Sequence, residues 1–490
     1  MRFHLPAFAR LICTLGICLF AIQTWGAEHP HVVLIMADDL GYGDVQPLNP
    51  ASRVATPAFN RLAREGLTFV DAHTPSAVCT PTRYGLLTGE YCWRTRLKRG
   101  VQNGYGAPLI AAERSTIGTV LGRAGYRTAV VGKWHLGLGF VGNEKEGVDF
   151  SQPLSHHPGS VGFDQSFIIP ASLDFPPYFY FKDGLATTQE VVDQAGVKFP
   201  AFTRRGPRAA DFNIRGCLDR LTDEAIAVVQ SMKDAEQPTF LYFPLTAPHK
   251  PVLPSLLFKG STELGPYGDF LRQVDGAIGR VIRALETEGV LEETLLIVTS
   301  DNGSFMYRLN EDVMDHTEDE SVQGYRTENH TANGRWRGTK ADIWEGGHRV
   351  PFFVRLPAKK FAGTRVNRVV GLVDVMATLA DYLDLTQVPS DGPDSVSFAD
   401  AFKDPVSGSV RPALICHSAN GMFAIREGKW KLVAGNGSGG RQAPKGKPFE
   451  EPWALFDLSS DPGETTDVAA KHPRVFESLK KTLYDIKGDD

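Results

Sequence analysis

Short apolar stretches that end in polar residues recur along this chain. Residues 31–36 are apolar and rich in β-branched side chains, and Asp38 and Asp39 follow them closely. Residues 126–131, 240–243 and 295–299 repeat the pattern, and the last of these runs into Asp301, Asn302 and Gly303. Short apolar runs bounded by loop residues are typical of strands buried on both faces. The sequence therefore predicts several buried strands that end in polar loops.

Amphipathic patterns of helical period separate these strands. They cover residues 56–65, 116–124, 218–231 and 268–288. Strands that alternate with helices predict an α/β fold, with a large, mostly parallel sheet sandwiched by helices. In such a sheet, ligands bind beyond the carboxyl ends of the strands, where the polar residues of this chain gather.

The composition changes after Leu385 toward Pro, Gly, Asp and Ser. Beyond that point residues 424–433 and 453–458 have strand patterns, and residues 474–486 have a helical pattern. We expect a catalytic domain at residues 28–395. Residues 396–490 are expected to form a small α+β subdomain, an antiparallel sheet with a helix.

Residues 140–215 show weak periodicity and many aromatic and proline residues. Long segments without regular structure are often functional, so this one can be an excursion over the binding cleft. A packed surface insertion is an equal alternative.

The N-terminus has the three parts of a secretory signal. Arg2 and Arg10 precede or flank an apolar run at residues 11–22, and Gly26 and Ala27 follow it. A membrane anchor is the competing interpretation, but the run is shorter than the roughly 20 residues that span a bilayer. We expect cleavage of a signal peptide at residues 1–27, export to the periplasm or the medium, and no stable membrane insertion.

Charge and cysteine content narrow the class of protein. The net charge is -5 without a basic block, so nucleic acid is not an expected partner, whereas a small anionic substrate is compatible. Two of the six cysteines lie in the predicted signal. If Cys79 is consumed chemically, Cys92, Cys217 and Cys416 can form at most one disulfide.

Cys79-Thr80-Pro81-Thr82-Arg83, followed by residues 84–89 ending in Thr88-Gly89, is the most specific motif in the chain. It resembles the signature of the sulfatase family, whereas the alternative is an ordinary buried cysteine. The resemblance implies that a maturation enzyme oxidises Cys79 to formylglycine. One hydroxyl of the hydrated aldehyde would attack sulfur, and the other would allow release of sulfate. Arg83 would stabilise the developing oxyanion.

Two polar pairs at strand ends offer hard oxygen ligands: Asp38 with Asp39, and Asp301 with Asn302. Such ligands suit Ca²⁺, and Mg²⁺ less well. Either pair alone is more often a turn or a helix cap. Sulfatases have an Asp-Asp pair after the first strand and an Asp-Asn-Gly element late in the sheet. The resemblance thus implies that these four residues and the residue made from Cys79 bind one Ca²⁺.

Three further motifs carry cationic or titratable side chains. Lys133 and His135 lie in Gly-Lys-Trp-His-Leu-Gly, His249 lies in Ala-Pro-His-Lys-Pro, and Lys340 lies in Arg-Gly-Thr-Lys-Ala-Asp-Ile-Trp-Glu-Gly-Gly. Two residues apart in extended chain, Lys133 and His135 can reach one pocket. Without context a solvated lysine, a core histidine and a turn histidine are the plain alternatives.

These motifs resemble sulfatase blocks, which implies roles for their residues. Lys133 would contact the nucleophile and sulfate, and His135 would handle the proton of the hydrate. His249 and Lys340 would act on the leaving-group side. We interpret Asp374 as a helix N-terminal residue outside the site, and Glu345 and His348 as less favoured substrate contacts.

The sequence thus predicts an enzyme that hydrolyses sulfate monoesters, of aryl or carbohydrate alcohols, to the alcohol and inorganic sulfate. Its substrate would be a sulfated small molecule or glycan. One rival is a phosphate or phosphonate ester hydrolase of the same superfamily. The other is a binding protein with this fold in which Cys79 is never oxidised.

Overall fold

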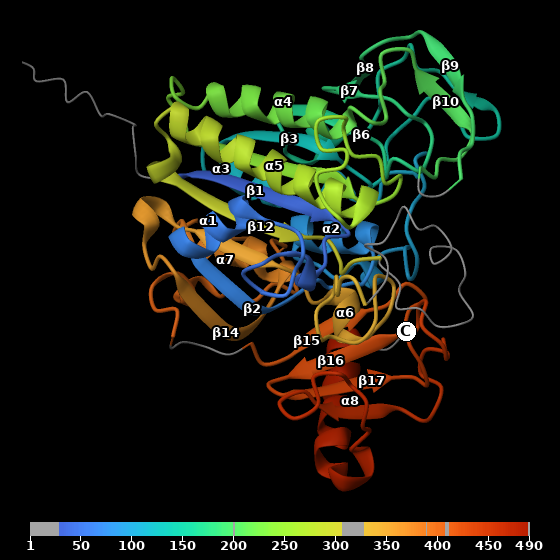
Figure 1. Cartoon of the computed structure of the whole chain (residues 1–490), viewed down its shortest axis with the longest axis vertical. Helices are drawn as coiled ribbons and strands as arrows, with labels where there is room; N and C mark the ends of the chain where they lie inside the picture. The colour runs from blue at the N-terminus through green and yellow to red at the C-terminus, as the bar shows by residue number, and fades with distance from the viewer. Residues whose placement is uncertain (1–28, 199–200, 306–327, 389, 407–410, 489–490) are drawn as a thin grey trace, which may run out of the picture.

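A ten-stranded sheet runs through the larger part of the molecule (Figure 1). The computed structural model describes residues 29–198, 201–305, 328–388, 390–406 and 411–488, so the predicted signal peptide lies outside the described residues. In spatial order the strands are β14 (Thr364–Gly371), β2 (Leu67–His73), β13 (Phe352–Arg355), β12 (Thr294–Ser300), β1 (His31–Asp38), β11 (Thr239–Pro248), β3 (Arg127–Lys133), β6 (Gln165–Ile169), β7 (Phe181–Lys182) and β8 (Leu185–Ala186).

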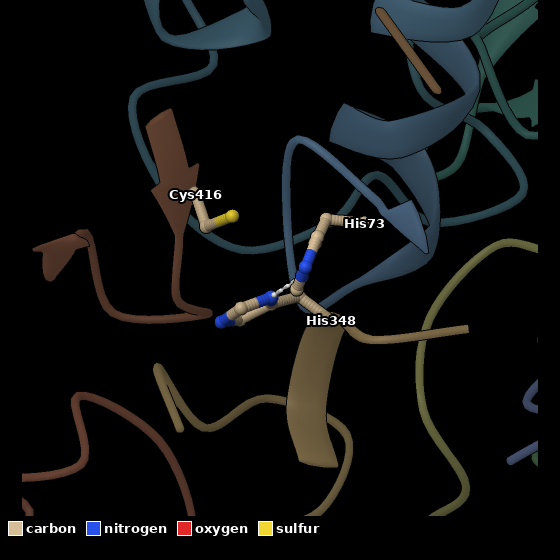
Figure 2. A group of neighbouring side chains, drawn as sticks. All are labelled: His73, His348 and Cys416. Atoms are coloured by element: carbon tan, nitrogen blue, oxygen red, sulfur yellow. Dashed lines mark hydrogen bonds between the residues drawn. The ribbon is translucent and has the colours of Figure 1, made fainter. Parts of the chain in front are cut away.

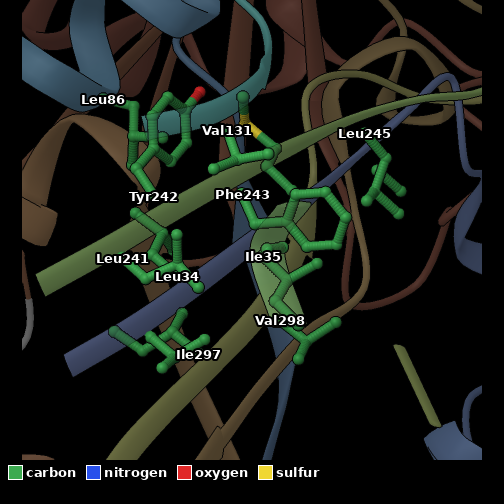
Figure 3. Packing of buried hydrophobic residues seen from close by; sticks show 14 of the residues in the cluster. Leu34, Ile35, Leu86, Val131, Leu241, Tyr242, Phe243, Leu245, Ile297 and Val298 are labelled. Carbon is green, nitrogen blue, oxygen red and sulfur yellow. The ribbon is translucent and has the colours of Figure 1, made fainter. Parts of the chain in front are cut away.

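The four predicted strands form the centre of this sheet. β1 pairs in parallel with β12 on one side and with β11 on the other, and β3 pairs in parallel with β11. Every residue of β11 and β12 is buried, as expected for strands covered on both faces. Figure 3 shows side chains of these strands, among them Leu34, Phe243 and Val298, packed in one cluster. The carboxyl ends of the four strands therefore meet at one edge.

Helices cover both faces of the sheet, which confirms the predicted α/β sandwich. α4 and α5 pack on β11 and on each other, and α1 packs on α5 and β13. α2, α3 and α7 contact one another and form the other layer. The bounds are α1 (Pro57–Glu65), α2 (Cys79–Thr88), α3 (Ile117–Arg123), α4 (Cys217–Gln230), α5 (Gly265–Thr287), α6 (Glu345–His348), α7 (Val375–Tyr382) and α8 (Pro473–Lys487).

Short 3₁₀ helices connect these elements. They are η1 (Tyr42–Asp44), η2 (Cys92–Arg94), η3 (Pro158–Val161), η4 (Leu291–Glu293), η7 (Pro357–Lys359), η8 (Leu372–Asp374), η9 (Ala399–Phe402) and η10 (Ala469–Lys471).

Residues 140–215 are mostly packed structure. Besides β6 to β8 they contain β4 (Gly142–Asn143), β5 (Gly147–Val148), β9 (Val191–Gln194) and β10 (Gly206–Ala209). The aromatic run from Tyr178 to Phe181 is buried in the main core. The packed-insertion interpretation therefore holds for these aromatic residues. The stretch that follows β6 is different, because it lies beside the site described below.

The C-terminal part contains its own four-stranded antiparallel sheet, drawn in orange and red in Figure 1. Its strands are β15 (Leu414–His417), β16 (Phe423–Glu427), β17 (Trp430–Ala434) and β18 (Ala454–Asp457), and α8 packs on β16 and β17. A second hydrophobic cluster includes Leu414 and Leu479, whereas Phe398 and Phe402 still pack in the main core. The domain boundary between residues 395 and 396 stays a prediction.

Candidate active site

Polar residues from four strand ends meet at the carboxyl edge of the central sheet. Asp38 ends β1, Lys133 ends β3, and Asp301 directly follows β12. His249 follows β11, and its N–H donates to the carbonyl of Asp38 at 3.0 Å. Each of these side chains is almost fully buried. Parallel pairing of the strands is what brings together residues that are far apart in the sequence.

Cys79 faces this group from the first position of α2. Its sulfur and one carboxylate oxygen each of Asp38 and Asp301 lie within 4.8 Å of one another. Lys340 Nζ lies 4.0 Å from the sulfur. Burial raises the pKa of the Cys79 thiol, and the nearby Lys133 and Lys340 only partly offset that effect. An unmodified thiol at this position would therefore be neutral and a weak nucleophile.

Arg83 lies one turn further along α2 and is fully buried. Its Nε and Nη2 donate to Asp301 Oδ2 at 3.1 and 2.7 Å, and its Nη1 donates to the carbonyl of Lys133 at 2.9 Å. The guanidinium fork thus fixes Asp301 and the end of β3. Paired donors of this kind hold a carboxylate in one orientation.

Two lysines pair with the first aspartates. Lys133 Nζ donates to Asp38 Oδ2 at 2.7 Å, and Lys340 Nζ donates to Asp39 Oδ1 at 2.6 Å. Burial lowers the pKa of Lys340, but the carboxylates, Asp39 first, more than offset this and leave the pKa raised. Lys340 therefore stays cationic in this buried group of side chains, called the pocket, which consists of Asp38, Asp39, Cys79, Arg83, Lys133, Asp301 and Lys340.

The two histidines, His135 and His249, are also buried beside this group, and each is neutral near pH 7. Burial lowers the pKa of His135 well below its usual value, with Lys133 and Arg83 adding to the effect. Burial and then Lys340 lower the pKa of His249, against Asp39. His135 Nε2 lies 2.7 Å from the carbonyl of Gln102, so it carries the proton. His135 Nδ1 is buried without a hydrogen-bond partner among the described residues, which leaves a lone pair available.

The backbone at His135 differs from the prediction. We expected extended chain from Lys133 to His135, but β3 ends at Lys133 and His135 has a left-handed backbone with φ 58°. The reason is tertiary: the N–H of His135 bonds the carbonyl of Pro170, beside β6, at 3.0 Å. Asp39, with φ 68°, and Ala341, with φ 82°, are also left-handed. Backbone strain of this kind gathers at functional sites.

The proposed metal ligands have oxygens left over. Asp38 Oδ1 and Asn302 Oδ1 are buried and accept no hydrogen bond in the described part of the chain. Asn302 Nδ2 is occupied, since it donates to Asp39 Oδ1 at 2.6 Å and to the carbonyl of Gly303 at 3.0 Å. Buried oxygens without a donor are costly, and a hard divalent cation would satisfy them. The donor set, three carboxylates and one amide, fits Ca²⁺.

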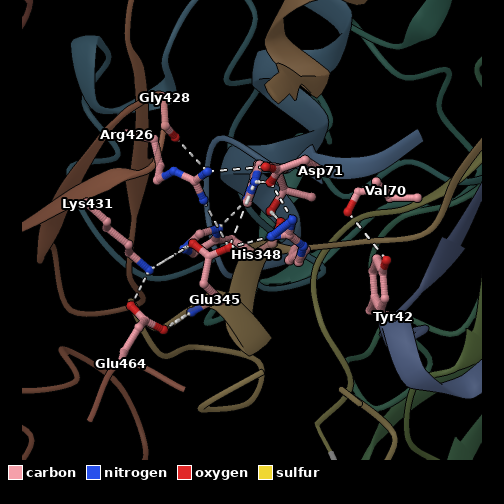
Figure 4. Close-up of polar contacts among 12 residues, drawn as sticks. Tyr42, Val70, Asp71, Glu345, His348, Arg426, Gly428, Lys431 and Glu464 are labelled. Carbon is pink, nitrogen blue, oxygen red and sulfur yellow. Dashed lines mark hydrogen bonds and ion pairs between the residues drawn. The ribbon is translucent and has the colours of Figure 1, made fainter. Parts of the chain in front are cut away.

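Asp374 lies outside this pocket, and so do Glu345 and His348, the less favoured candidates for substrate contacts. Asp374 accepts from the N–H of Gly371 at 2.9 Å and also pairs with Arg411, at the start of α7. Glu345 and His348 belong instead to a buried network between the two sheets (Figure 4). Its members are Asp71, His73, Glu345, His348, Arg349, Arg426, Lys431 and Glu464.

In this buried network, both nitrogens of each histidine and both oxygens of two carboxylates, Asp71 and Glu345, have polar partners. His73 Nδ1 lies 3.0 Å from His348 Nδ1, a contact marked by the dashed line in Figure 2. His73 Nε2 lies 2.6 Å from Asp71 Oδ1. Lys431 Nζ lies 3.1 Å from His348 Nε2 and 3.2 Å from Glu345 Oε1. Cys416 lies beside the two imidazoles, and all four cysteines in the described ranges are free. Every imidazole nitrogen here has a partner, which indicates a structural role.

Comparison with known proteins decides the family. The family model described as Sulfatase matches residues 30–385. The chain belongs to the sulfatase family. This sulfatase is 31% identical to the N-acetylgalactosamine-6-O-sulfatase of Bacteroides thetaiotaomicron, over 94% of each chain. It is 30% identical to human Arylsulfatase A, over 93% of this chain and 87% of the relative.

A solved structure gives the same result. A protein from a study of glycosaminoglycan metabolism by Bacteroides thetaiotaomicron superposes with a TM-score of 0.83 at 30% identity, over 94% of this chain and 100% of that chain. The sulfatase is thus a sulfuric ester hydrolase, which converts sulfate monoesters to an alcohol and inorganic sulfate. Within the described residues, the sulfatase has no helix that is both long and apolar enough to span a membrane.

Proposed function

We propose that this sulfatase uses a formylglycine made from Cys79, with one Ca²⁺ bound by Asp38, Asp39, Asp301, Asn302 and residue 79. The observation that carries the proposal is the approach of the Cys79 sulfur to Asp38 and Asp301 within 4.8 Å. Hydrated formylglycine supplies a nucleophilic hydroxyl and a second hydroxyl through which sulfate is released. Bound Ca²⁺ would neutralise charge on the sulfate oxygens.

The side chains of the chain itself then have distinct tasks. Lys133 and Lys340 provide positive charge near residue 79, where a dianionic transition state needs it. Arg83 holds Asp301 in place through two donors. The free lone pair of His135 Nδ1 suits a proton acceptor for the nucleophilic hydroxyl. His249 and Lys340 are assigned to the leaving oxygen, with Lys340 as the cationic donor.

We further propose that the natural substrate is a carbohydrate sulfate encountered outside the cytoplasm, after cleavage of residues 1–27. The names of two relatives support this, an N-acetylgalactosamine-6-O-sulfatase and a protein of glycosaminoglycan metabolism. Aryl sulfates would serve as model substrates, because the residues above are proposed to bind only the sulfate group. A maturation enzyme that oxidises Cys79 is required in the producing cell.

The test is turnover of nitrophenyl sulfate and nitrophenyl phosphate by protein co-produced with a formylglycine-generating enzyme. The proposal predicts strong preference for the sulfate ester, and loss of activity on chelation that Ca²⁺ restores. Cys79→Ala should abolish turnover, whereas Cys92→Ala, which changes another buried free thiol, should not. Equal activity on the phosphate ester would favour the phosphatase alternative. Full activity of Cys79→Ala would refute the assigned nucleophile.

A further inference from the structure

Asp174 is a buried carboxylate next to the pocket that no step above uses. Its side chain is 2% exposed, and its Oδ1 has no hydrogen-bond partner among the described residues. Its Oδ2 accepts from Arg204 Nη1 at 2.6 Å and lies 3.9 Å from Lys250 Nζ. One oxygen is therefore anchored, and the other is left without a donor. A buried carboxylate oxygen in that state costs free energy unless a ligand satisfies it.

Two contacts place Asp174 near the two histidines beside the pocket. The adjacent Phe175 packs its ring against the ring of His135, with centroids 6.2 Å apart. Lys250, which faces Asp174, directly follows His249 in the chain. The carboxylate thus lies between the neighbours of both pocket histidines. The segment that leads from β6 to Asp174 begins beside His135, because the N–H groups of Trp134 and His135 bond the carbonyls of Ile169 and Pro170.

The surroundings keep Asp174 rigid. Arg204 also donates to the backbone carbonyl of Asp174 at 3.0 Å, and its guanidinium carbon stacks 4.0 Å from the Phe175 ring centroid. Lys250 Nζ lies 4.6 Å from the Phe202 ring centroid. A carboxylate fixed by a guanidinium and backed by aromatic rings can present its second oxygen without further ordering cost.

We propose that Asp174 forms a saccharide subsite in which its Oδ1 accepts a hydrogen bond from a hydroxyl of the sugar ring that carries the sulfate. This inference rests on the proposed function and names its substrate class. Sugars have hydroxyl donors next to the esterified position, and nitrophenyl sulfate has none. The subsite therefore discriminates in favour of carbohydrate sulfates at a step separate from sulfate recognition.

The experiment compares kcat/KM for a monosaccharide sulfate, for the series of its analogues that each lack one ring hydroxyl, and for nitrophenyl sulfate. Asp174→Ala should lose about 10- to 100-fold on the parent sugar, as expected for one hydrogen bond to a charged group, and little on nitrophenyl sulfate. With the wild type, kcat/KM for one of the deoxy analogues should be lower than for the parent sugar by a similar factor. With Asp174→Ala, that analogue and the parent sugar should have equal kcat/KM. Asp174→Asn can still accept a hydrogen bond from Arg204, so it controls for misfolding of Asp174→Ala. Its kcat/KM on the parent sugar should lie between those of the wild type and of Asp174→Ala.

Asp193→Ala, at an exposed carboxylate of β9 in the same insertion, is the matched control and should change neither substrate. The subsite is refuted if every deoxy analogue behaves like the parent sugar, or if Asp174→Ala lowers both substrates equally. Failure of the wild type on nitrophenyl sulfate would instead refute the proposed function, so the two failures are distinguishable.

Discussion

The pocket and the buried network contain the same kinds of side chain in matching numbers. Three carboxylates face three cations in the pocket: Asp38, Asp39 and Asp301 against Arg83, Lys133 and Lys340. In the network Asp71, Glu345 and Glu464 face Arg349, Arg426 and Lys431. Both groups are buried, so neither composition nor burial distinguishes them.

Hydrogen bonding does distinguish them. In the network both oxygens of Asp71 and of Glu345 have cationic partners, and all four imidazole nitrogens are paired. In the pocket and beside it, Asp38 Oδ1, Asn302 Oδ1 and His135 Nδ1 form no hydrogen bond with the described residues, and Arg83 Nη2 lies 3.7 Å from Asp38 Oδ1. In the network Glu464 Oε1 also accepts no hydrogen bond, but it lies 2.7 Å from the cationic Lys431 Nζ. A saturated cluster stabilises the fold, whereas one with free acceptors is completed by a ligand. Changes in the pocket should therefore affect turnover, and changes in the network should affect stability.

The largest expected effect is on catalysis. Asp38→Asn keeps the size of the side chain and an acceptor for Lys133, but removes a charge next to residue 79. We expect kcat/KM for nitrophenyl sulfate to fall on the order of 10³-fold. The free energy of unfolding in urea should also fall, by about 3 kcal/mol or less, because Lys133 loses its buried counter-charge, so kcat/KM is measured on the folded fraction. Retention of wild-type kcat/KM would contradict the role of Asp38.

Lys431→Met should have the reverse effect. It removes the cation that contacts Glu345, Glu464 and His348 and leaves buried charge unpaired, so the free energy of unfolding should fall by about 3–5 kcal/mol. The kcat of the folded fraction should stay within about threefold of wild type. Lys429→Met is the control, since Lys429 pairs with Asp457 at an exposed position and should cost less than ~1 kcal/mol. If kcat of the folded fraction fell by much more than about threefold, the network would take part in catalysis.

The smallest expected effect is the pH dependence of stability that comes from Asp275, a buried carboxylate that bonds no cation among the described residues. Among the described residues, Asp275 accepts from the N–H groups of Ala58 and Phe59, and burial raises its pKa to about 6 against these bonds and the more distant Arg272. A carboxyl with a raised folded pKa favours the protonated state, so stability is lost as the pH rises from about 4 through about 6. Relative to Asp275→Asn, the wild type should lose about 3 kcal/mol across that range, measured by urea unfolding. A difference that is independent of pH would contradict the assignment.

The sequence predicted the centre of the fold because local pattern determines it there. Long apolar runs made β1, β3, β11 and β12 recognisable, and the helices between them began and ended within a few residues of the predicted bounds. β2 and β13 were not predicted. β13 has four residues and runs antiparallel between β12 and β2, so its pairing depends on partners distant in the sequence.

The site was predictable as a set of residues but not as a geometry. Motif resemblance identified Cys79, Lys133 and the aspartates, and the structure brings them together. The left-handed backbone at His135 depends on a bond to Pro170, which no local pattern encodes. The buried network was missed for the same reason, since His73, His348 and Lys431 come from three distant segments. Asp174 carries no motif, and only its unpaired oxygen reveals it.

Peptide mass spectrometry across residue 79, on protein purified from its natural source and shown to hydrolyse sulfate esters, tests the account most directly. We predict the mass of an aldehyde or its hydrate in place of the cysteine side chain. An unmodified thiol at residue 79 in fully active protein would contradict the mechanism.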